Sequence, residues 1–341
     1  LRDGVLTFVP EGSMPNKLQD YVVTVDKKTT DYTPKVNLVK QEDKDIIDVL
    51  IDDVHFTSYH FSDEWKKPFL WPVIAEGGFH VTRDYPADPE GTPEEARDHI
   101  HHKSIWSAYG EVNDVDCWGE GDGSGYQTVL DVTFGSGDAY GWIKSKNVWQ
   151  DKDKKDIISE EREYRFYATP EKGRLIDVNV VFTANKGDVT FVDTKEGGLV
   201  AVRMSHLMTK RAAEITNSHG DTGEPKCWGK PSPWCDYSAD IEGFGYRGIT
   251  VFDNPGNLRY PTSWHVRGYG LMGANAFGYS YFGEKPHNKG LVPENGDYKF
   301  KKDEVLSFNY RVYVHSGDVE EAKVADRFAD YATPPKVSFV E

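Results

Sequence analysis

The chain has 341 residues, a formal net charge of −16, 13% aromatic residues and a mean hydropathy of −0.63. The acidic balance argues against nucleic acid and anionic membrane surfaces as partners, because both require a basic face. No apolar run approaches the ~20 residues that a membrane-spanning helix needs. The length fits one large β domain or two smaller ones, and the composition indicates a core and clefts built largely from aromatic rings.

Strand-like patterns dominate the chain. Runs that alternate in polarity, or that are rich in β-branched and aromatic residues, cover 45–61, 126–135, 161–169, 174–184 and 305–315. The segment 174–192 predicts a hairpin or tight pair that turns at Asn185-Lys186-Gly187. The glycine-rich stretch 119–125 predicts turns or a loop.

The first helix signal lies at 91–98, GTPEEARD. Thr92 is suited to the N-cap, Pro93 to the first helical position, and Glu95 follows three residues after the cap. This pattern predicts a short helical turn that leads directly into a histidine-rich segment.

The second helix signal lies at 316–332, with Asp318 as the predicted cap and an apolar stripe formed by Val324, Phe328 and Tyr331. We expect this helix to pack the C-terminal part of the chain against a sheet. There is no internal repeat, long linker or low-complexity tract. Many strands and few helices therefore predict an all-β, mainly antiparallel protein, folded as one large β-sandwich domain over 1–341 with a short C-terminal helix.

The histidine-rich segment is RDHIHHKSIW at 97–106. In a strand, His99 and His101 would share one face and His102 the other, whereas in a loop several imidazoles could converge. Imidazoles suit proton transfer near neutral pH, and neutral imidazoles also bind divalent metals. The spacing lacks the i, i+4 pair of zinc proteases, so hydrogen bonding, proton transfer and metal binding all stay open.

Further segments also join aromatic or apolar residues to acids, amides or cations near a turn. They are KPFLWPV with GGFHVTRDYP, YGEVNDVDCWGEGDG, TKEGGLVAVRMSH, CWGKPSPWCDYSA and FDNPGNLRYPTSWHVRGYG. Any single tryptophan is expected in the core, and any single Arg–Asp neighbour pair is expected on the surface. Together these segments are typical of a sugar site, where rings stack on a pyranose and polar groups bind hydroxyls or a uronate.

The ordered motifs from about Lys67 to His315 resemble the soluble bacterial family labelled PmoA-like, or "methane oxygenase PmoA". Ile100, Lys103 and Ser104 stand where that family's pattern has proline, arginine and glycine. Methane oxidation is rejected, because a particulate methane oxygenase subunit needs several membrane helices. The resemblance implies a sandwich similar to galactose-mutarotase-like folds and a link to glycan degradation.

The leading hypothesis is a carbohydrate-active enzyme that cleaves a glycosidic bond, as a glycoside hydrolase or a lyase. For elimination from a uronate, His101 or His102 would be the base and Asp98 its orienting partner. The predicted carboxylate clamp would come from Arg83, Lys103 or Arg259.

Hydrolysis would instead need two carboxyls about 5–9.5 Å apart, for which Glu196 and Asp236 are the candidates, with His265 as an acid. Each residue predicted to bind substrate carries an aromatic ring, an imidazole, an amide or a cation. They are His80, Arg83, His99, Lys103, Trp106, Trp118, Trp234, Asn257, Arg259 and Trp264.

Two alternatives stay open: an aldose epimerase-like isomerase that uses one histidine and one glutamate, and a non-catalytic sugar-binding protein. No cofactor is expected, although a structural divalent metal is allowed. The expected partner is a carbohydrate, with oligomeric state left open. The start at Leu1 suggests a mature periplasmic or secreted form whose leader has been removed. The three cysteines are an odd number, and Cys227 and Cys235 could form a bridge.

Overall fold

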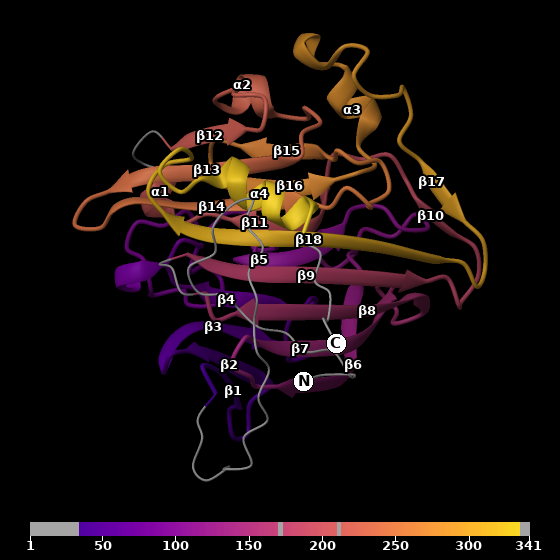
Figure 1. The fold of residues 1–341 in the computed structure, drawn as a ribbon. Helices are drawn as coiled ribbons and strands as arrows, with labels where there is room; N and C mark the ends of the chain where they lie inside the picture. The colour runs from indigo at the N-terminus through magenta and orange to yellow at the C-terminus, as the bar shows by residue number, and fades with distance from the viewer. Residues whose placement is uncertain (1–33, 170–172, 210–212, 335–341) are drawn as a thin grey trace, which may run out of the picture.

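The computed structural model describes residues 34–169, 173–209 and 213–334, which form two large sheets (Figure 1). The first sheet follows the order β1 (Val36–Lys40), β2 (Ile46–Ile51), β3 (Val54–His60), β4 (Phe69–Val73), β5 (Ile105–Tyr109), β11 (Gly197–Arg203), β16 (Leu271–Asn275) and β15 (Ser263–Arg267). The second follows the order β12 (Glu214–Asn217), β13 (Trp234–Ile241), β14 (Gly245–Asp253), β18 (Val305–Ser316), β9 (Arg174–Thr183), β8 (Asp156–Tyr167), β7 (Tyr140–Gln150) and β6 (Tyr126–Gly135).

Within the described residues, every pairing between these strands is antiparallel. One buried apolar cluster joins the sheets, with Ile47 and Met272 from the first sheet and Trp149 and Val251 from the second. The predicted all-β, mainly antiparallel sandwich is therefore confirmed. No helix in the described ranges is long and apolar enough to cross a bilayer.

Alternation along the strands explains how the shared core forms. In β9, Ile176, Val178, Val180 and Phe182 are buried, while the residues between them are only partly covered. Successive strand side chains point to opposite faces, so this pattern gives one apolar face to the core. The period-two signal in the sequence thus has a direct structural counterpart.

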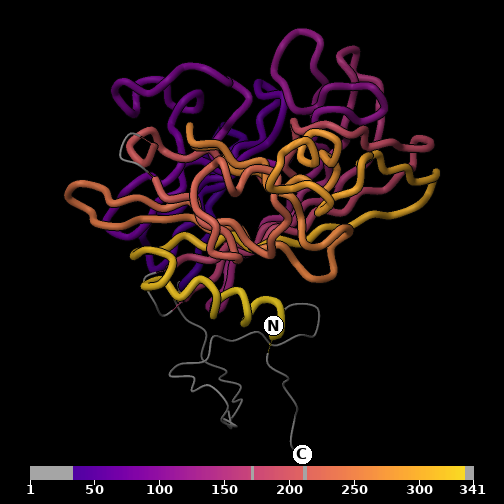
Figure 2. Tube along the Cα trace, turned by 90° about the horizontal axis from the view of Figure 1, so that it is seen from above, coloured from indigo at the N-terminus to yellow at the C-terminus, as the bar shows by residue number. Residues whose placement is uncertain are grey.

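The helices are few and short. They are η1 (Glu76–Gly78), α1 (His206–Thr209), α2 (Glu224–Cys227), α3 (Tyr279–Gly283), η2 (Pro286–Asn288) and α4 (Val324–Ala332). The predicted C-terminal helix exists as α4 but begins later than expected. Asp318 Oδ1 accepts the backbone N–H groups of Glu320 and Glu321 and so stabilises a turn ahead of the helix. Figure 2 shows α4 along one side of the molecule, where Phe328 packs on Phe252 of the second sheet.

Two predicted local structures are wrong. Residues 91–98 form no helix, because the Thr92 hydroxyl donates to Asp84 at 2.5 Å instead of capping a helix. The chain does turn at 185–187, but β9 pairs with β8 and β18, whereas the next strand, β10 (Val189–Phe191), pairs with β17 (Tyr298–Phe300). Long-range pairing therefore replaces the local hairpin.

The three cysteines are buried and unbridged, so no disulfide joins Cys227 and Cys235. A second apolar cluster, separate from the shared core, includes Phe69, Trp106 and Trp118. It belongs to β4, β5 and the loop after β5, beside the residues that form the main cavity described next.

Candidate active site

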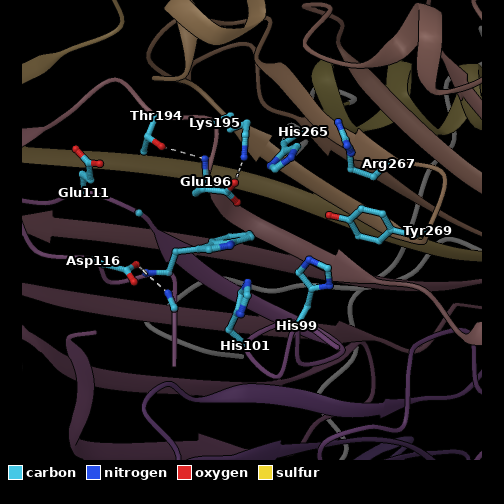
Figure 3. A pocket seen from close by; sticks show the side chains of 13 residues that line it. His99, His101, Glu111, Asp116, Thr194, Lys195, Glu196, His265, Arg267 and Tyr269 are labelled. Carbon is cyan, nitrogen blue, oxygen red and sulfur yellow. Dashed lines mark hydrogen bonds and ion pairs between the residues drawn. The ribbon is translucent and has the colours of Figure 1, made fainter. Parts of the chain in front are cut away.

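A cavity of about 490 Å³, the main cavity, is lined by four separate parts of the chain. These are residues 99–101, residues 110–119, residues 194–196 before β11, and residues 265–269 at the end of β15 and beyond. Its volume falls within the usual ~300–1,000 Å³ of ligand pockets. Figure 3 shows His99 and His101 on one side of this space and Glu196, His265 and Arg267 on the other.

The histidine-rich segment is a loop, so the converging arrangement is the one that occurs. His99 and Ser104 adopt left-handed backbone conformations, with φ of 44° and 50°. Such angles are uncommon for residues other than glycine and need support from the surrounding structure. Arg83 supplies that support: its buried guanidinium donates to the carbonyl oxygens of Asp98, His99 and His102 at 3.0, 2.8 and 3.2 Å.

Asp98 and His99 form a carboxylate–imidazole pair, with Oδ2 and Nδ1 2.8 Å apart. Partial burial alone would raise the pKa of Asp98, but the hydrogen bond from His99 and the charges of Arg203 and Arg83 hold it below its usual value. The carboxylate therefore accepts the Nδ1 proton. In neutral His99 this leaves Nε2 as the proton acceptor.

The imidazoles of His101 and His265 are held in the neutral form. Burial, together with the charges of Lys67 and His99, lowers the pKa of His101 to about 4. Burial also lowers the pKa of His265 to about 3, with Lys195 and Arg267 acting in the same direction. A neutral imidazole can accept a proton or a hydrogen bond from a sugar hydroxyl, whereas an imidazolium can only donate.

His102 is covered by its neighbours and does not line the main cavity. Its Nδ1 lies 3.4 Å from Arg203 Nη1, and its Nε2 is buried with no hydrogen-bond partner among the described residues. Because arginine only donates, Nδ1 is the acceptor and Nε2 carries the proton. Burial and the neighbouring charges of His101 and Arg203 lower the pKa of His102.

Across the cavity lie two cations and a carboxylate. Lys195 pairs with Glu196, and Arg267 Nη1 lies 3.3 Å from Glu224 Oε1 at an accessible position. Burial and the Arg267 charge lower the pKa of Lys195. These groups suit an anionic ligand, because both cations retain donors beyond their own ion pairs.

Tyr269 lines the main cavity beside Arg267, and Figure 3 shows its hydroxyl pointing inward. Its ring stacks on His99 at 5.2 Å, and the Arg203 guanidinium lies 4.7 Å from the ring centroid. Burial raises the pKa of Tyr269, so the phenol is protonated at neutral pH. It can donate a proton to an oxygen in the cavity.

Trp118 gives the main cavity an aromatic wall. Asp116 Oδ1 accepts the backbone N–H groups of Trp118 and Gly119, both at 2.8 Å, and so fixes this loop. The Trp118 ring lies 6.0 Å from that of His101. A sugar ring bound here would meet both an aromatic surface and an imidazole.

Five residues proposed from the sequence line the main cavity: His99, His101, Trp118, Glu196 and His265. Four others adjoin these residues without lining it: Arg83, Asp98, His102 and Trp106. In the structure Asp98 contacts His99 rather than His101 or His102, so the orienting pair differs from the one expected.

Asp236, proposed to pair with Glu196 for hydrolysis, lies in the other sheet. Its Oδ2 is 2.8 Å from His315 Nε2 and accepts the Thr250 hydroxyl at 2.6 Å. Trp234, on the same strand, packs in the cluster that includes Phe328 of α4. The structure therefore does not bring Glu196 and Asp236 into one cavity.

Three further proposed residues, in the loop after β14 and in β15, make structural contacts instead of lining the main cavity. Asn257 bonds to Asp253 and to the Asn309 backbone, and the Trp264 indole is buried in the shared core. Arg259 donates to backbone carbonyls at 276, 296 and 297, which leaves it unsuited to the predicted carboxylate clamp.

Two other proposed residues also lie outside the main cavity. His80 pairs with Asp84 at 2.9 Å. Lys103 is buried and pairs with Glu120 at 2.6 Å, while Lys67 contacts the same carboxylate at 3.0 Å. Burial lowers the pKa of Lys103 to about 8. Lys67 also donates to the carbonyl of Gly119, a residue that lines the main cavity. The buried group of Lys67, Lys103 and Glu120 therefore supports the cavity wall.

The list of candidates from the sequence omitted Lys195, Arg203, Arg267 and Tyr269. All four lie within TKEGGLVAVRMSH and FDNPGNLRYPTSWHVRGYG, with Lys195 directly beside the chosen Glu196 and Arg267 two positions after the chosen His265. The available signal was that proximity, but choosing among neighbours requires the three-dimensional arrangement. Within the described residues, no group of three or more His, Cys, Asp or Glu side chains is arranged to hold a metal ion.

The model of a family described as "Family of unknown function (DUF6807)" matches residues 46–329. This chain belongs to the DUF6807 family. The PmoA-like label inferred from the motifs finds no support in that match. A comparison with curated proteins found no match.

Among solved structures, this DUF6807 member is similar to a glycoside hydrolase family 97 enzyme in complex with acarbose from Pseudoalteromonas sp. strain K8. The identity is 9% and the TM-score 0.34, over 84% of this chain and 34% of the other, so the chain spans about a third of that enzyme. It is also similar to galactose 1-epimerase from Lactobacillus acidophilus NCFM, with 6% identity and a TM-score of 0.36 over 84% and 100% of the two chains. With TM-scores below 0.5, neither likeness supports a functional assignment.

Proposed function

We propose that this protein is a carbohydrate-active enzyme that cleaves a uronate-containing saccharide by elimination. The observation that carries the proposal is that His99, whose Nδ1 is held by Asp98, lies across one cavity from the cations Lys195 and Arg267. Elimination needs a base for the proton alpha to a carboxylate and positive charge to stabilise the resulting enolate-like state.

In the proposed reaction, Lys195 and Arg267 bind the uronate carboxylate. His99 Nε2 removes the proton from the adjacent ring carbon, and the C–H electron pair becomes the new carbon–carbon double bond. The bond to the leaving glycosidic oxygen breaks, and the Tyr269 hydroxyl supplies that oxygen with a proton. Asp98 fixes the His99 ring through Nδ1 and stabilises the imidazolium that forms, while His101 and Glu196 can bind hydroxyls.

Two features favour elimination over hydrolysis by a carboxyl pair. Glu196 lacks its proposed partner in the cavity, because Asp236 is buried against His315. The Asp116 carboxylate is already engaged by the Trp118 and Gly119 backbone and by the Ser124 hydroxyl. An isomerase is the second candidate, favoured by the Glu196 carboxylate and the neutral imidazole of His101, which lie on opposite sides of the main cavity.

Product analysis tests the proposal directly. The protein is incubated with a panel of uronate-containing polysaccharides, and the products are followed by near-ultraviolet absorbance, reducing ends and mass. Elimination gives an unsaturated sugar without uptake of water. Saturated fragments would indicate hydrolysis, epimerised sugars of unchanged length would indicate an isomerase, and no change across the panel would refute glycan cleavage.

The same assay assigns the base. His99→Ala should lower kcat by about 10²–10⁴-fold, the usual contribution of a positioned general base. His219→Ala is the matched control, because His219 is exposed and hydrogen-bonded to the Pro231 carbonyl outside the main cavity. Unchanged turnover in His99→Ala would exclude His99 as the base.

A further inference from the structure

A second, smaller cavity of about 220 Å³, the side cavity, adjoins the main cavity. The two share Tyr269, and the side cavity is also lined by Arg83, Glu95, Asp98 and Arg203. Asp98 lies on the side cavity, while its partner His99 lies on the main one. The Asp98–His99 pair and Tyr269 therefore stand at the boundary between two spaces.

Arg203 has unused hydrogen-bonding capacity although it is only 4% exposed. Its Nε has no hydrogen-bond partner among the described residues, and its contacts to His102 and Asp98 are long, at 3.4 and 3.5 Å. Burying guanidinium donors without good partners costs free energy. Arg83, in contrast, is engaged by several backbone carbonyls.

The charges around the side cavity favour a neutral polar occupant. An anion would meet Glu95 and Asp98, a cation would meet Arg83 and Arg203, and an apolar group would leave Arg203 unsatisfied. A sugar hydroxyl accepts from an arginine and donates to a carboxylate at the same time. The volume is below that of usual ligand pockets, which suits a single small ring.

We propose that the side cavity is a second sugar subsite, which binds the hydroxyls of a neutral unit next to the uronate in the main cavity. The substrate is then at least a disaccharide, and its linkage crosses the boundary beside His99 and Tyr269, where the proposed bond cleavage occurs. This inference rests on the proposed function and restricts it to a linked saccharide, since a single uronate bound in the main cavity would leave the side cavity empty.

Crystals soaked in concentrated glucose, galactose, mannose or xylose, and separately in sulfate, provide the test. We expect a sugar ring in the side cavity with hydroxyls hydrogen-bonded to Arg203 and Glu95, and its loss in Arg203→Met and Glu95→Gln. Arg203→Lys, which keeps the charge but not the planar fork of donors, should weaken binding of the sugar ring in the side cavity. Arg97→Met and Glu90→Gln are controls on the same loop, because that pair is exposed.

Thermal melting establishes that each variant is folded before soaking. A side cavity that takes sulfate but no sugar, or only water in every soak, would overturn the subsite. The two proposals fail separately. Glycan cleavage without sugar in the side cavity refutes only the subsite, whereas sugar bound there without cleavage of any glycan refutes the proposed enzyme.

Discussion

The histidines of the site differ because their surroundings differ, although three of them are nearly adjacent in sequence. His99 is exposed and carries a carboxylate on Nδ1, whereas His101 is mostly enclosed and lies near the Lys67 charge. Desolvation disfavours the charged imidazole, and a nearby cation adds to that effect. The loop thus combines one oriented base with one imidazole that stays neutral.

Lys67→Met should raise the pKa of His101 above its value of about 4, because the substitution removes the largest charge effect that lowers it. NMR titration of the His101 ring measures this shift without any substrate. Lys66→Met is the matched control, since the Lys66 ammonium bonds to the carbonyls of Gly121 and Ser124. A His101 pKa that stays unchanged or falls in Lys67→Met would contradict the electrostatic explanation.

Among the elements, the loop at 97–104 is decisive, and a residue outside it determines its shape. Arg83 reaches carbonyls from Ala96 to His102 and supports the left-handed backbone at His99. A planar guanidinium can serve several carbonyls in fixed directions, whereas an ammonium cannot reproduce that fork. Arg83 is therefore a positioning residue for the proposed base.

Arg83→Lys should lower kcat about tenfold or more with a smaller change in KM, because it keeps the charge but loosens the backbone that carries His99. Arg97→Lys, at an exposed position on the same loop, should leave both constants unchanged. A purely structural role would lower the melting temperature without altering the pH profile. We expect Arg83→Lys to change the pH profile of kcat as well.

The same elements mark how far the sequence could be interpreted. Period-two alternation was sufficient for strands such as β9, because burial of one face is a local pattern with a strong energetic cause. The hairpin predicted at 174–192 does not form, because β10 pairs with β17, which lies more than 100 positions further along the chain. The helix predicted to begin at Thr92 does not form, because the Thr92 hydroxyl donates to Asp84 instead of capping it.

The site was predictable to a similar degree. The motif order drew attention to His99, His101, Trp118, Glu196 and His265, which the fold brings together. It could not separate these from Asp236 or Arg259, whose carboxylate and guanidinium are equally typical of a sugar site but bind other partners in the fold. A sequence shows the type of each residue. It does not show which sheet face the side chain occupies or which other group takes its hydrogen bonds.

At the scale of the whole molecule, the neutral imidazoles couple the site to stability. Burial is the largest cause that lowers the pKa of His101, His102 and His265 below the ordinary value of about 6.5. Below that pH the unfolded chain takes up protons that the folded chain refuses, so the free energy of unfolding falls as pH falls. This stabilisation is complete above about pH 6.5 and declines toward pH 4.

In a melting series from pH 7 to pH 5, each imidazole that is protonated only on unfolding should lower stability by up to about 1.4 kcal/mol per pH unit. Asp253 acts in the opposite direction, because burial raises its pKa to about 7, and the measured slope is the balance of the two effects. His265→Phe should reduce this slope, because phenylalanine has a similar shape and binds no proton, whatever its effect on stability at pH 7. His219→Phe, at an exposed position, should leave the slope unchanged. The pKa values of the carboxylates Asp84, Asp98 and Glu120 are lowered, so their stabilisation is lost mainly below about pH 5, as pH falls through the ordinary carboxyl values. A slope that is the same in the wild type and in His265→Phe would show that burial of His265 does not couple stability to pH.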